Sequence, residues 1–546
     1  MWFSTFRLVA YVILFGIGQV FAQFFVWEPP IYNSTFEQYI DHTNPSLGTF
    51  QQRYWYNSEF WGGQGSLVIF INGPELDASI TASDVGNGSF WFVYAQEVKA
   101  DIILVEHRYW GESSPYEVLD AEAFKYLTVE QTIADYTHFA RTVKLPFDTD
   151  ASSNAPQAPW VSVGCSYPGM LAAWTSRLDP GTFWAYHAMS APSQANIEYW
   201  EYYDLIRTAM PQNCSRDLVR IAQHVGDTIT TGDPIKVADL KDMFSTGALN
   251  YDDFARALVF GLDNWQIEMF SNVGTTSLFL HMCDAIEGAV DGVPGSAIPE
   301  EGVGLERALP NFASWFKTDF IANRCMGAVL FSNTDNLTLY EDWLSPNSVA
   351  CLDWRLNATS SSVIDLSPKS PRDRRYWWLT CNELMLWTFQ VFLSCSAPPN
   401  NRPSLISRTI TTDYAAGICS RLFPADKGYK YGLANGRTAE TVNAHTGGWD
   451  YTNSTRLMWS NGELDRWGTR GVSSKFRPGG SLQSTEEVPV FVIPGGHHCS
   501  DSFLSQIMNP GVKAVQEAEI AYVKKWVAGF MSRRAALDLG AGRDRI

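Results

Sequence analysis

The sequence predicts an α/β fold with a large, mainly helical insertion, and two observations carry this prediction. In the first part of the chain, apolar strand-like runs alternate with amphipathic stretches, which is typical of a sheet covered by helices. From about residue 195 to 430, strand-like alternation is rare and several segments look helical, so this region does not continue the sheet. Strand-like runs return at residues 456–459 and 488–493.

The expected elements of the first part follow in order. Residues 67–71 and 102–105 are apolar runs that end in turn-forming or polar residues, as strands do. Residues 127–141 have apolar side chains at near-helical spacing, with Thr128 as the expected N-cap. Residues 160–163 form a strand-like run that passes through Gly-Cys-Ser into an apolar, Ala-rich stretch. We therefore expect a strand, a sharp turn and a helix in succession at that point.

These patterns divide the chain into five expected segments. A chain of 546 residues is long enough for two packed units. The last helix candidate covers residues 512–531. The segments are a signal peptide (1–22), the first part of the sheet domain (23–194), a helical cap (195–430), the second part of the sheet domain (431–532) and a flexible tail (533–546).

The N-terminus has the composition of a secretory signal peptide. Residues 1–7 carry one positive charge and residues 8–20 are apolar. Val20 and Ala22 provide small residues at the −3 and −1 positions of a cleavage site before Gln23. The apolar run is short for a membrane span, and an uncleaved anchor is the alternative. No second long apolar run follows, so we expect no membrane span after cleavage.

The charge of the chain excludes some classes of partner. Lys and Arg total 40 against 58 Asp and Glu, which gives a formal net charge of −18. A nucleic-acid-binding protein needs a basic surface to displace counterions, and the sequence has no such footprint. Anionic membrane surfaces are disfavoured for the same reason. An acidic composition suits a protein that works below neutral pH, where self-repulsion between carboxylates falls.

Two further features agree with export to a secreted or a vacuolar/lysosomal location. The nine cysteines include no CxxC pair, so neither a zinc site nor a thioredoxin-like site is predicted, and we expect no cofactor and no metal. Cys165 is expected to be a free, buried thiol, and the other eight cysteines are enough for four disulfides, whose pairing the sequence leaves open. Six sequons predict N-glycosylation, at Asn33, Asn87, Asn213, Asn336, Asn357 and Asn453.

Ser166 is the candidate nucleophile because it stands where a strand-like run meets a helix-like one. In α/β-hydrolases this turn is tight and lifts the serine hydroxyl clear of the sheet. The usual G-x-S-x-G pattern is imperfect here: Gly164 precedes the serine, but Pro168 replaces the second glycine and Gly169 follows it. A serine hydroxyl also needs a histidine that takes its proton and a carboxylate that orients the histidine.

The other two members of a catalytic triad are present in the chain order of this fold, which is serine, acid, histidine. Asp465 follows the run at residues 456–459, and Glu463 is the alternative carboxylate. His497 and His498 follow the run at residues 488–493, and on spacing alone either is a candidate base. The sequence thus predicts an α/β-hydrolase fold with the helical cap inserted between the nucleophile and the acid.

An oxyanion hole requires two backbone N–H groups that point at the developing negative charge. The N–H of Tyr167, directly after the nucleophile, is the expected first donor. The second is expected from the loop after residues 67–71, where Gly73 is the best candidate because Pro74 has no N–H.

Several motifs, spread over most of the mature chain, together resemble one family. The most specific are His-Arg-Tyr-Trp-Gly-Glu-Ser at 107–113 and Thr-Cys-Asn-Glu at 380–383, and the others lie at 36–42, 49–54, 126–131, 164–171, 461–467 and 496–498. They resemble the proline-specific serine peptidases that include lysosomal Pro-Xaa carboxypeptidase, dipeptidyl peptidase II and secreted fungal prolyl endopeptidases.

The resemblance implies roles for particular residues. It implies Ser166 as the nucleophile, Asp465 as the carboxylate and the first of the two histidines, His497, as the base. It also implies that the helical cap closes over the cleft. Trp467 and Met170 match positions near a proline-accepting pocket, where an apolar aromatic slot suits a pyrrolidine ring. Departures from the family pattern beside the serine and beside Asp465 concern substrate preference rather than the triad.

The sequence therefore predicts a secreted serine peptidase that hydrolyses peptide bonds on the carboxyl side of proline through an acyl-enzyme. Peptides, proline-containing ones above all, are the expected partners, and nucleic acids are not. An esterase or lipase on the same fold is one alternative, because ester and amide hydrolysis share the triad. A non-catalytic binding module on the same scaffold is the other.

Overall fold

The computed structural model describes residues 31–268, 277–289, 298–332, 334–357, 359–384, 397–399, 401–425 and 428–543. The expected signal peptide at residues 1–22 lies outside the described residues, as does Cys395.

One eight-stranded sheet organises the described chain, with strand order β1-β2-β4-β3-β5-β6-β7-β8. β1 and β2 form an antiparallel hairpin and β2 pairs antiparallel with β4, whereas every pair from β4 onward is parallel. This order, with a sharp strand-to-helix turn after β5, confirms the predicted α/β-hydrolase fold. The strands are β1 (Tyr32–Tyr39), β2 (Thr49–Asn57), β3 (Leu67–Ile71), β4 (Ala100–Val105), β5 (Trp160–Cys165), β6 (Ala185–Met189), β7 (Leu457–Gly462) and β8 (Val490–Ile493).

Alternate side chains of β3 pack on opposite faces of the sheet, which explains its continuous apolar run. Val68 and Phe70 belong to the core shared with α2 (Val129–Thr142) and α3 (Tyr167–Leu178). Ile69 and Ile71 instead pack with α1 (Phe90–Val98) and the last helix, α15 (Pro510–Arg543). A parallel strand that is covered on both faces has no solvent side, so all five residues are apolar and buried.

The N-cap of α2 confirms one local prediction. The side chain of Thr128 accepts a hydrogen bond from the N–H of Gln131, and the helix begins at the next residue, Val129. This bond satisfies one of the donors that a helix start leaves without a partner.

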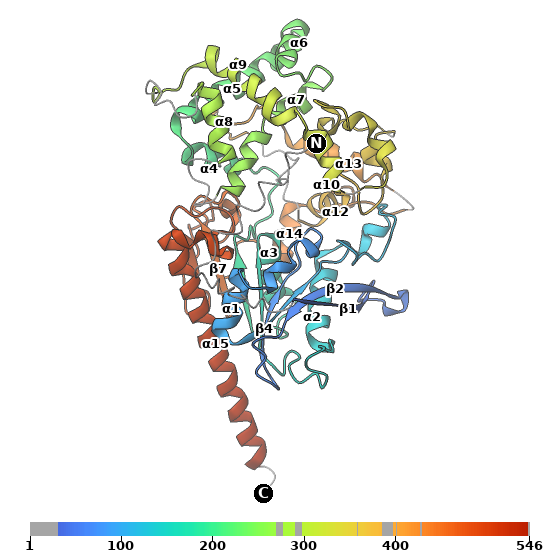
Figure 1. Ribbon diagram of the computed structural model, residues 1–546, viewed down its shortest axis with the longest axis vertical. Coiled ribbons are helices and arrows are strands. Elements are labelled where there is room, and N and C mark those ends of the chain that lie inside the picture. The colour runs from blue at the N-terminus through green and yellow to red at the C-terminus, as the bar shows by residue number, and fades with distance from the viewer. Residues whose placement is uncertain are drawn as a thin grey trace, which may run out of the picture.

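The insertion lies between β6 and β7, and its described residues form helices and turns. In Figure 1 it occupies the upper half of the molecule, above the carboxyl ends of the parallel strands. Its helices are α4 (Glu201–Ala209), α5 (Gln212–Thr231), α6 (Pro234–Met243), α7 (Tyr251–Ala257), α8 (Leu278–Glu287), α9 (Leu305–Trp315), α10 (Arg324–Ser332), α11 (Ser361–Ile364), α12 (Arg374–Trp378), α13 (Thr412–Leu422) and α14 (Ala439–Thr446).

The insertion has two parts that differ in how they are packed. Helices α4 to α10 form a hydrophobic core of their own, with aromatic side chains such as Phe254 and Phe312 at its centre. Later residues, among them Trp378 and Phe423, belong to the same core as α2 and α3. The expected boundary between residues 430 and 431 therefore falls inside a continuous core, because Tyr431 itself packs in it.

The tail expected from residue 533 is helical, because α15 continues to Arg543. Figure 1 shows the end of this helix extending beyond the body of the protein. The segment after Ser532 contains arginine, alanine and leucine, which favour helix, and no glycine before Gly540. Nη1 of Arg534 donates to the carbonyl of Gln157 at 3.0 Å, which holds this part of the helix to the sheet domain.

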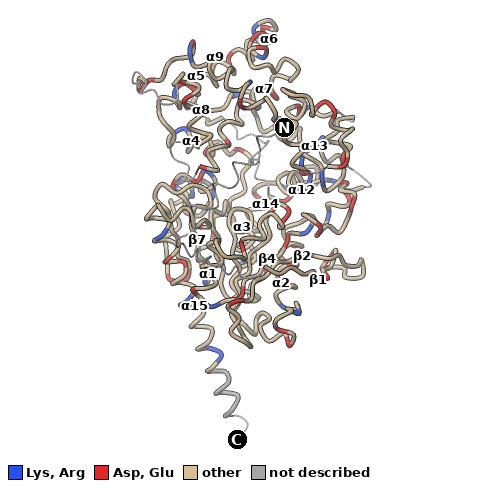
Figure 2. The backbone as a smooth tube through the Cα atoms, in the orientation of Figure 1, with Lys and Arg blue, Asp and Glu red and all other residues tan. Residues whose placement is uncertain are grey.

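Charged residues of both signs are spread along the described chain. Figure 2 shows acidic and basic residues interspersed along the backbone in both the sheet domain and the insertion. Among the described residues, no helix is both long and apolar enough to cross a membrane.

Candidate active site

Ser166 occupies the turn between β5 and α3 in an unusual backbone conformation. Its φ of 65° and ψ of −129° lie where non-glycine residues are rarely found, and its N–H donates to the carbonyl of Met189 at 2.9 Å. Such strain persists only when the surrounding structure imposes it, and it is characteristic of the serine turn in α/β-hydrolases.

Close packing at the turn explains the two glycines that flank it. A Cβ on Gly164 would lie 2.5 Å from the backbone of Pro168, and one on Gly169 would lie 2.8 Å from the carbonyl oxygens of Gly164 and Met189. Pro168 is tolerated because it lies in the first turn of α3, where a backbone N–H has no helical acceptor. Gly169 thus provides the close approach that the usual motif assigns to the preceding position.

Asp465 lies on the loop after β7, where it starts a short 3-10 helix (Arg466–Arg470). Its side chain is fully buried, and Oδ1 accepts a hydrogen bond from the N–H of Trp467 at 2.9 Å. Burial by itself raises the pKa of this carboxyl, but the charge of His498 and hydrogen bonds from His498, Ser190 and Trp467 lower it overall. Asp465 is therefore held as a carboxylate. The alternative, Glu463, accepts from the N–H of Gly495 instead.

The histidine that contacts Asp465 is His498, and this corrects the expectation that His497 is the base. Nδ1 of His498 lies 3.0 Å from Oδ1 of Asp465, and the imidazole lines the same cavity as Ser166. His497 points elsewhere: its ring packs on Trp265 with 4.9 Å between centroids, and its Nδ1 has no hydrogen-bond partner among the described residues. Burial lowers the pKa of His497, which keeps that ring neutral.

The path of the loop after β8 explains why His498, and not His497, contacts Asp465. The N–H of His497 donates to Oγ of Ser500 at 2.8 Å, and the N–H of Cys499 donates to Oγ of Ser190 at 3.0 Å. These bonds turn the backbone so that the second histidine, not the first, faces β7. The two histidines differ by only one position in their spacing from the strand, and the sequence does not show which of them faces Asp465.

A cavity of about 550 Å³ opens in front of Ser166 and His498. The sheet domain and the insertion both contribute to its wall, which is mainly apolar and aromatic. Its lining residues are Pro74, Glu75, Leu76, Cys165, Ser166, Pro168, Gln266, Pro371, Arg372, Asp373, Tyr376, Trp377, Thr380, His498, Cys499 and Phe503. This size and lining are typical of a site for a small organic group.

Glu75 is a residue of this cavity that the sequence analysis did not identify. Burial raises the pKa of its carboxyl to about 7. The side chain is therefore neutral, and able to donate a hydrogen bond, at acidic pH. Glu75 directly follows the Asn-Gly-Pro turn after β3. Ligands bind at the carboxyl ends of the strands in open α/β sheets, so this position is the sequence feature that could have identified Glu75 as a site residue.

The two expected oxyanion donors differ in their surroundings. The N–H of Tyr167 opens α3 directly after Ser166. The N–H of Gly73, in contrast, donates to the hydroxyl of Tyr136 at 3.0 Å in a buried position. A Cβ there would lie 2.2 Å from the carbonyl of Val105, so this glycine serves backbone packing. Gly73 therefore does not offer a free donor, which corrects that expectation.

The two expected pocket residues do not line the cavity. Met170 is buried in the core between the sheet and its helices. Trp467 lies behind the wall: its Nε1 donates to Oε1 of the lining residue Gln266 at 2.6 Å, and its ring centroid is 6.3 Å from that of His498. Trp467 supports the wall and the base rather than forming the wall.

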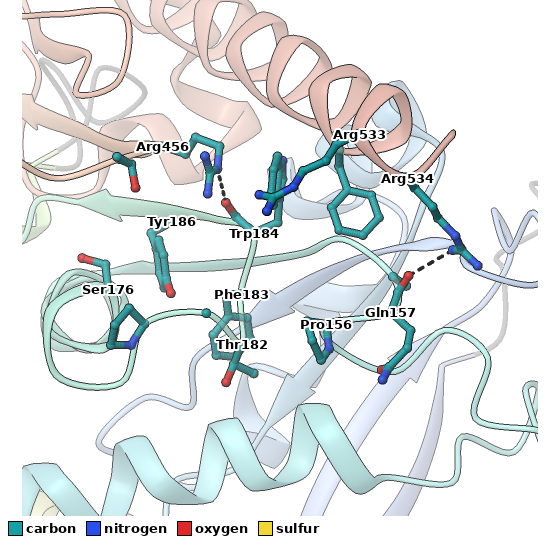
Figure 3. Close-up of a pocket in the computed structure, with 15 residues that line it drawn as sticks. Pro156, Gln157, Ser176, Thr182, Phe183, Trp184, Tyr186, Arg456, Arg533 and Arg534 are labelled. Atoms are coloured by element: carbon teal, nitrogen blue, oxygen red, sulfur yellow. Dashed lines mark hydrogen bonds between the residues drawn. The ribbon is translucent and has the colours of Figure 1, made fainter. Parts of the chain in front are cut away.

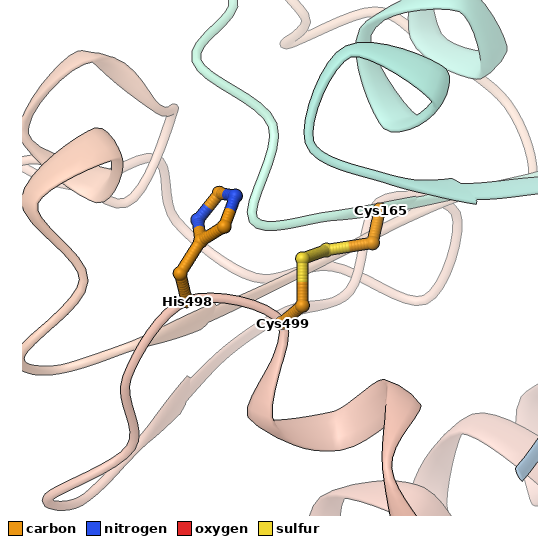
Figure 4. A group of neighbouring side chains, drawn as sticks. All are labelled: Cys165, His498 and Cys499. Atoms are coloured by element: carbon orange, nitrogen blue, oxygen red, sulfur yellow. A yellow bond between two sulfur atoms is a disulfide. The ribbon is translucent and has the colours of Figure 1, made fainter. Parts of the chain in front are cut away.

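Cys165 is half of a disulfide, so the expectation of a free thiol is wrong. It is joined to Cys499, and Figure 4 shows this disulfide beside the imidazole of His498. The thiol appeared isolated in the sequence only because its partner is 334 residues away. The other three disulfides are Cys214–Cys283, Cys325–Cys351 and Cys381–Cys419.

The expected glycosylation sites are accessible to different degrees. Five of the asparagines are exposed, at Asn33, Asn87, Asn336, Asn357 and Asn453. Asn213 is only partly exposed, in the first turn of α5. Glycosylation of these residues remains a prediction.

A second cavity, of about 560 Å³, lies at the opposite edge of the sheet. Its wall includes Ala158, Trp184 and Arg456, which precede or begin strands, whereas Ser166 and Asp465 follow strands. Figure 3 shows Arg456 and Arg533 on one side of it. The cavity holds no histidine and no carboxylate, so it has no acid–base pair with which to activate a nucleophile.

Among the described residues, two groups of side chains have atoms close enough for a metal ion. One consists of Cys165, Cys499 and His498, but its sulfur atoms are joined in the disulfide and are not thiolates. The other consists of His187, Asp501 and Glu519, all fully buried. Burial raises the pKa of both carboxyls, in each case to about 8, so protons neutralise them without a cation.

The strand order and the strained serine turn place this protein in the class of α/β-hydrolase-fold proteins. Residues 38–231 and 318–517 match the sequence model of the family described as serine carboxypeptidase S28. The chain therefore belongs to this family and is a serine peptidase, which confirms the resemblance seen in its motifs.

Similar proteins cover almost the whole chain. The serine protease vicPb of Bipolaris victoriae is 36% identical over 502 residues, which cover 92% of this chain and 90% of the relative. Lysosomal Pro-X carboxypeptidase of Bos taurus is 24% identical over 515 residues, covering 91% and 88%. A relative of Arthroderma benhamiae described as a "Probable extracellular serine carboxypeptidase" is 26% identical over 514 residues, covering 90% and 66%.

Among solved structures, the proline iminopeptidase of Mycobacterium smegmatis matches 91% of this chain and 99% of its own, with a TM-score of 0.36 and 11% sequence identity.

Proposed function

We propose that this protein is a secreted or vacuolar/lysosomal peptidase that cleaves peptide bonds on the carboxyl side of proline, with Ser166, His498 and Asp465 as its catalytic triad. The observation that carries the proposal is the contact of 3.0 Å between His498 Nδ1 and Asp465 Oδ1, beside the cavity that Ser166 lines. Relatives described as extracellular or lysosomal support the location.

In the proposed acylation step, Ser166 Oγ attacks the carbonyl carbon of the scissile bond. Nε2 of His498 takes the hydroxyl proton and then gives it to the leaving amine. Asp465 holds Nδ1 protonated and stabilises the imidazolium that forms, which its lowered pKa favours. Deacylation follows when His498 takes a proton from water, which attacks the acyl-enzyme. His498 then gives this proton to Ser166 Oγ as the ester bond breaks, and the product acid leaves.

Two backbone donors are proposed for the negatively charged oxygen of the tetrahedral intermediate. The first is the N–H of Tyr167, at the start of α3, where the helix dipole favours negative charge. Because the N–H of Gly73 is used by Tyr136 and Pro74 has none, the second is proposed to be the N–H of Glu75, on a loop that lines the cavity. This N–H bonds the carboxyl of its own residue and has to leave it in order to bind the oxyanion.

Specificity for proline is supported by the shape and chemistry of the cavity. Its aromatic and proline side chains, which include Tyr376, Trp377 and Pro371, suit a pyrrolidine ring that has no N–H to satisfy. The printed name of the bovine relative, a Pro-X carboxypeptidase, agrees with this substrate class.

Acidic working conditions are proposed from Glu75. With a pKa of about 7, this carboxyl is protonated below neutral pH and carries no charge that would oppose an anionic intermediate nearby. At higher pH it ionises beside the proposed oxyanion site, and activity is expected to fall.

The test is mass-spectrometric mapping of the products from a mixed peptide library, with Ser166→Ala as the control. Cleavage after proline by the wild type and not by the variant supports the proposal, and the positions of the cuts separate internal from terminal cleavage. Absence of cleavage by folded, glycosylated protein between pH 3 and 8, with turnover of p-nitrophenyl esters, would favour the esterase alternative.

A further inference from the structure

The disulfide Cys165–Cys499 joins the two loops that carry the nucleophile and the base. Cys165 directly precedes Ser166, and Cys499 directly follows His498. Their Cα atoms are 5.9 Å apart although 334 residues separate them in the chain. The three other disulfides among the described residues lie within the insertion. This one alone among them links a neighbour of the proposed nucleophile to a neighbour of the proposed base.

The two ends of the disulfide differ in how firmly they are held. Cys165 is the last residue of β5 and pairs in register with Met189 of β6, in the middle of the sheet. Cys499 lies in a loop outside any strand, with a left-handed backbone φ of 57°. The disulfide therefore attaches a loop to a rigid strand end.

The other contacts of the segment 497–499 in the part of the chain that the structure describes are non-covalent. The hydrogen bond from His497 N–H to Ser500 is local to the loop. Beyond the loop there are a hydrogen bond from Cys499 N–H to Ser190 Oγ and the contact of His498 with Asp465. The rings of His498 and His497 also pack near Trp467 and Trp265. Each hydrogen bond of this kind contributes only about 1 kcal/mol, so breaking it is easy compared with breaking a covalent bond.

We propose that Cys165 and Cys499 are positioning residues for catalysis: their disulfide fixes the imidazole of His498 relative to the hydroxyl of Ser166, and its reduction switches the peptidase off without unfolding it. This inference rests on the proposed triad. Figure 4 shows the arrangement, with the imidazole and the disulfide on the same side of the loop.

Reduction by a dithiol or a phosphine breaks the S–S bond with two electrons and two protons and leaves two thiols. The dithiol becomes a cyclic disulfide, or the phosphine becomes its oxide with water as the source of the oxygen and of both protons. Air or a disulfide oxidant reverses the step, because both thiols remain next to each other in the folded protein. The lining of the active-site cavity includes both cysteines, which gives a small reductant access to the bond.

The expected effect follows from the sensitivity of proton transfer to geometry. A displacement of about 1 Å in a catalytic group lowers the rate by about 100-fold. The cavity wall that binds substrate is formed mostly by other residues, so substrate binding is expected to change little. A positioning role therefore predicts a fall in kcat with nearly constant KM.

The experiment compares the double variant Cys165→Ala/Cys499→Ala with the control Cys325→Ala/Cys351→Ala, which removes a disulfide from the insertion. The first is expected to lose about 100-fold in kcat, with KM within about twofold, and to react with a fluorophosphonate at Ser166 correspondingly slowly. The control is expected to lower Tm while kcat stays within about twofold. Equal kcat in the wild type and the first variant would overturn the inference.

A second measurement covers the case in which the double variant fails to fold. Native wild-type protein is titrated with a phosphine, and each disulfide is followed by mass spectrometry while near-UV circular dichroism monitors folding. Activity should fall in step with reduction of Cys165–Cys499 and return on reoxidation. Full activity with this pair reduced would contradict the inference. An unreduced wild type with no Ser166-dependent activity would instead contradict the proposed triad.

Discussion

Two histidine–carboxyl groups lie near the carboxyl ends of β6, β7 and β8, and they differ in almost every property that matters for catalysis. His498 lines a cavity together with Ser166, and the buried Asp465 contacts His498. His187 Nε2 lies 3.2 Å from Glu519 Oε1, next to Asp501, and all three side chains are fully buried. Proximity of a histidine to a carboxyl group is therefore not enough to define an active site.

The proton state explains the difference. Asp465 faces a histidine and receives hydrogen bonds from three groups, which lower its pKa in spite of burial. Asp501 and Glu519 face each other in a buried place, and burial raises the pKa of both carboxyls. Burial also lowers the pKa of His187 to about 4. One group therefore has an ionised carboxylate beside its histidine, and the other is a neutral cluster that packs α15 against the sheet.

The largest expected effect is on kcat, and it distinguishes the His498–Asp465 pair from the buried cluster that contains Asp501. Asp465→Asn should lower kcat by about 10⁴-fold, because the amide cannot hold the imidazole in the required tautomer. Asp501→Asn should change kcat by less than about threefold, because asparagine resembles the protonated carboxyl already present. Steady-state kinetics on a prolyl peptide measures both. Similar losses in the two variants would mean that the comparison is wrong.

A smaller effect concerns Glu75, a buried carboxyl that opens on the catalytic cavity. Because its pKa is about 7, wild-type activity should fall above neutral pH, to roughly a tenth of its plateau at pH 8. Glu75→Gln stays neutral at every pH and should lose this alkaline limb. The measurement is a pH profile of kcat/KM for both proteins. An unchanged alkaline limb in the variant would show that ionisation of Glu75 does not cause the loss of activity.

The smallest expected effect is on the stability of the fold, and it comes from the buried cluster of His187, Asp501 and Glu519. The pKa values of Asp501 and Glu519 are higher in the folded than in the unfolded chain, so the folded state binds more protons and loses stability as pH rises toward 8. Burial lowers the pKa values of His187 and His107 to about 4, so their contribution makes the folded state more stable as pH rises, but only below about pH 6.5.

Between pH 6.5 and 8 the raised carboxyl pKa values therefore dominate, and Glu75 and Asp101 contribute beside the cluster, so the Glu519 variant is needed to separate them. Tm should fall by a few degrees over this range in the wild type and by less in Glu519→Gln, whose side chain cannot ionise. Thermal unfolding followed by fluorescence at a series of pH values tests this. A variant that loses as much Tm as the wild type would show that the cluster is not titrating.

Much of the fold could be predicted because the central parallel strands are continuous apolar runs. β3, β5 and β7 were located from such runs, whereas the β1–β2 hairpin was not, because its exposed and buried residues alternate irregularly. β6 was also missed: it is short and contains His187. Serine and aspartate of the site could be placed, because each follows a strand in the order that the fold requires.

The remaining features depend on contacts between distant segments. The orientation of His497 and His498 is decided by the loop that Cys499 anchors, and the pairing of Cys499 with Cys165 spans 334 residues. The N–H of Gly73 is unavailable because of Tyr136, which lies 63 residues further along the chain. None of these contacts leaves a local pattern in the sequence.

The most direct test of the account is the pair of variants His498→Ala and His497→Ala, assayed side by side for kcat on a prolyl peptide and for the rate at which a fluorophosphonate labels Ser166. The account predicts that His498→Ala loses at least about 10⁴-fold in kcat and labels very slowly, whereas His497→Ala stays within about tenfold of the wild type. A severe loss in His497→Ala with substantial activity in His498→Ala would contradict the central claim that His498 is the catalytic base.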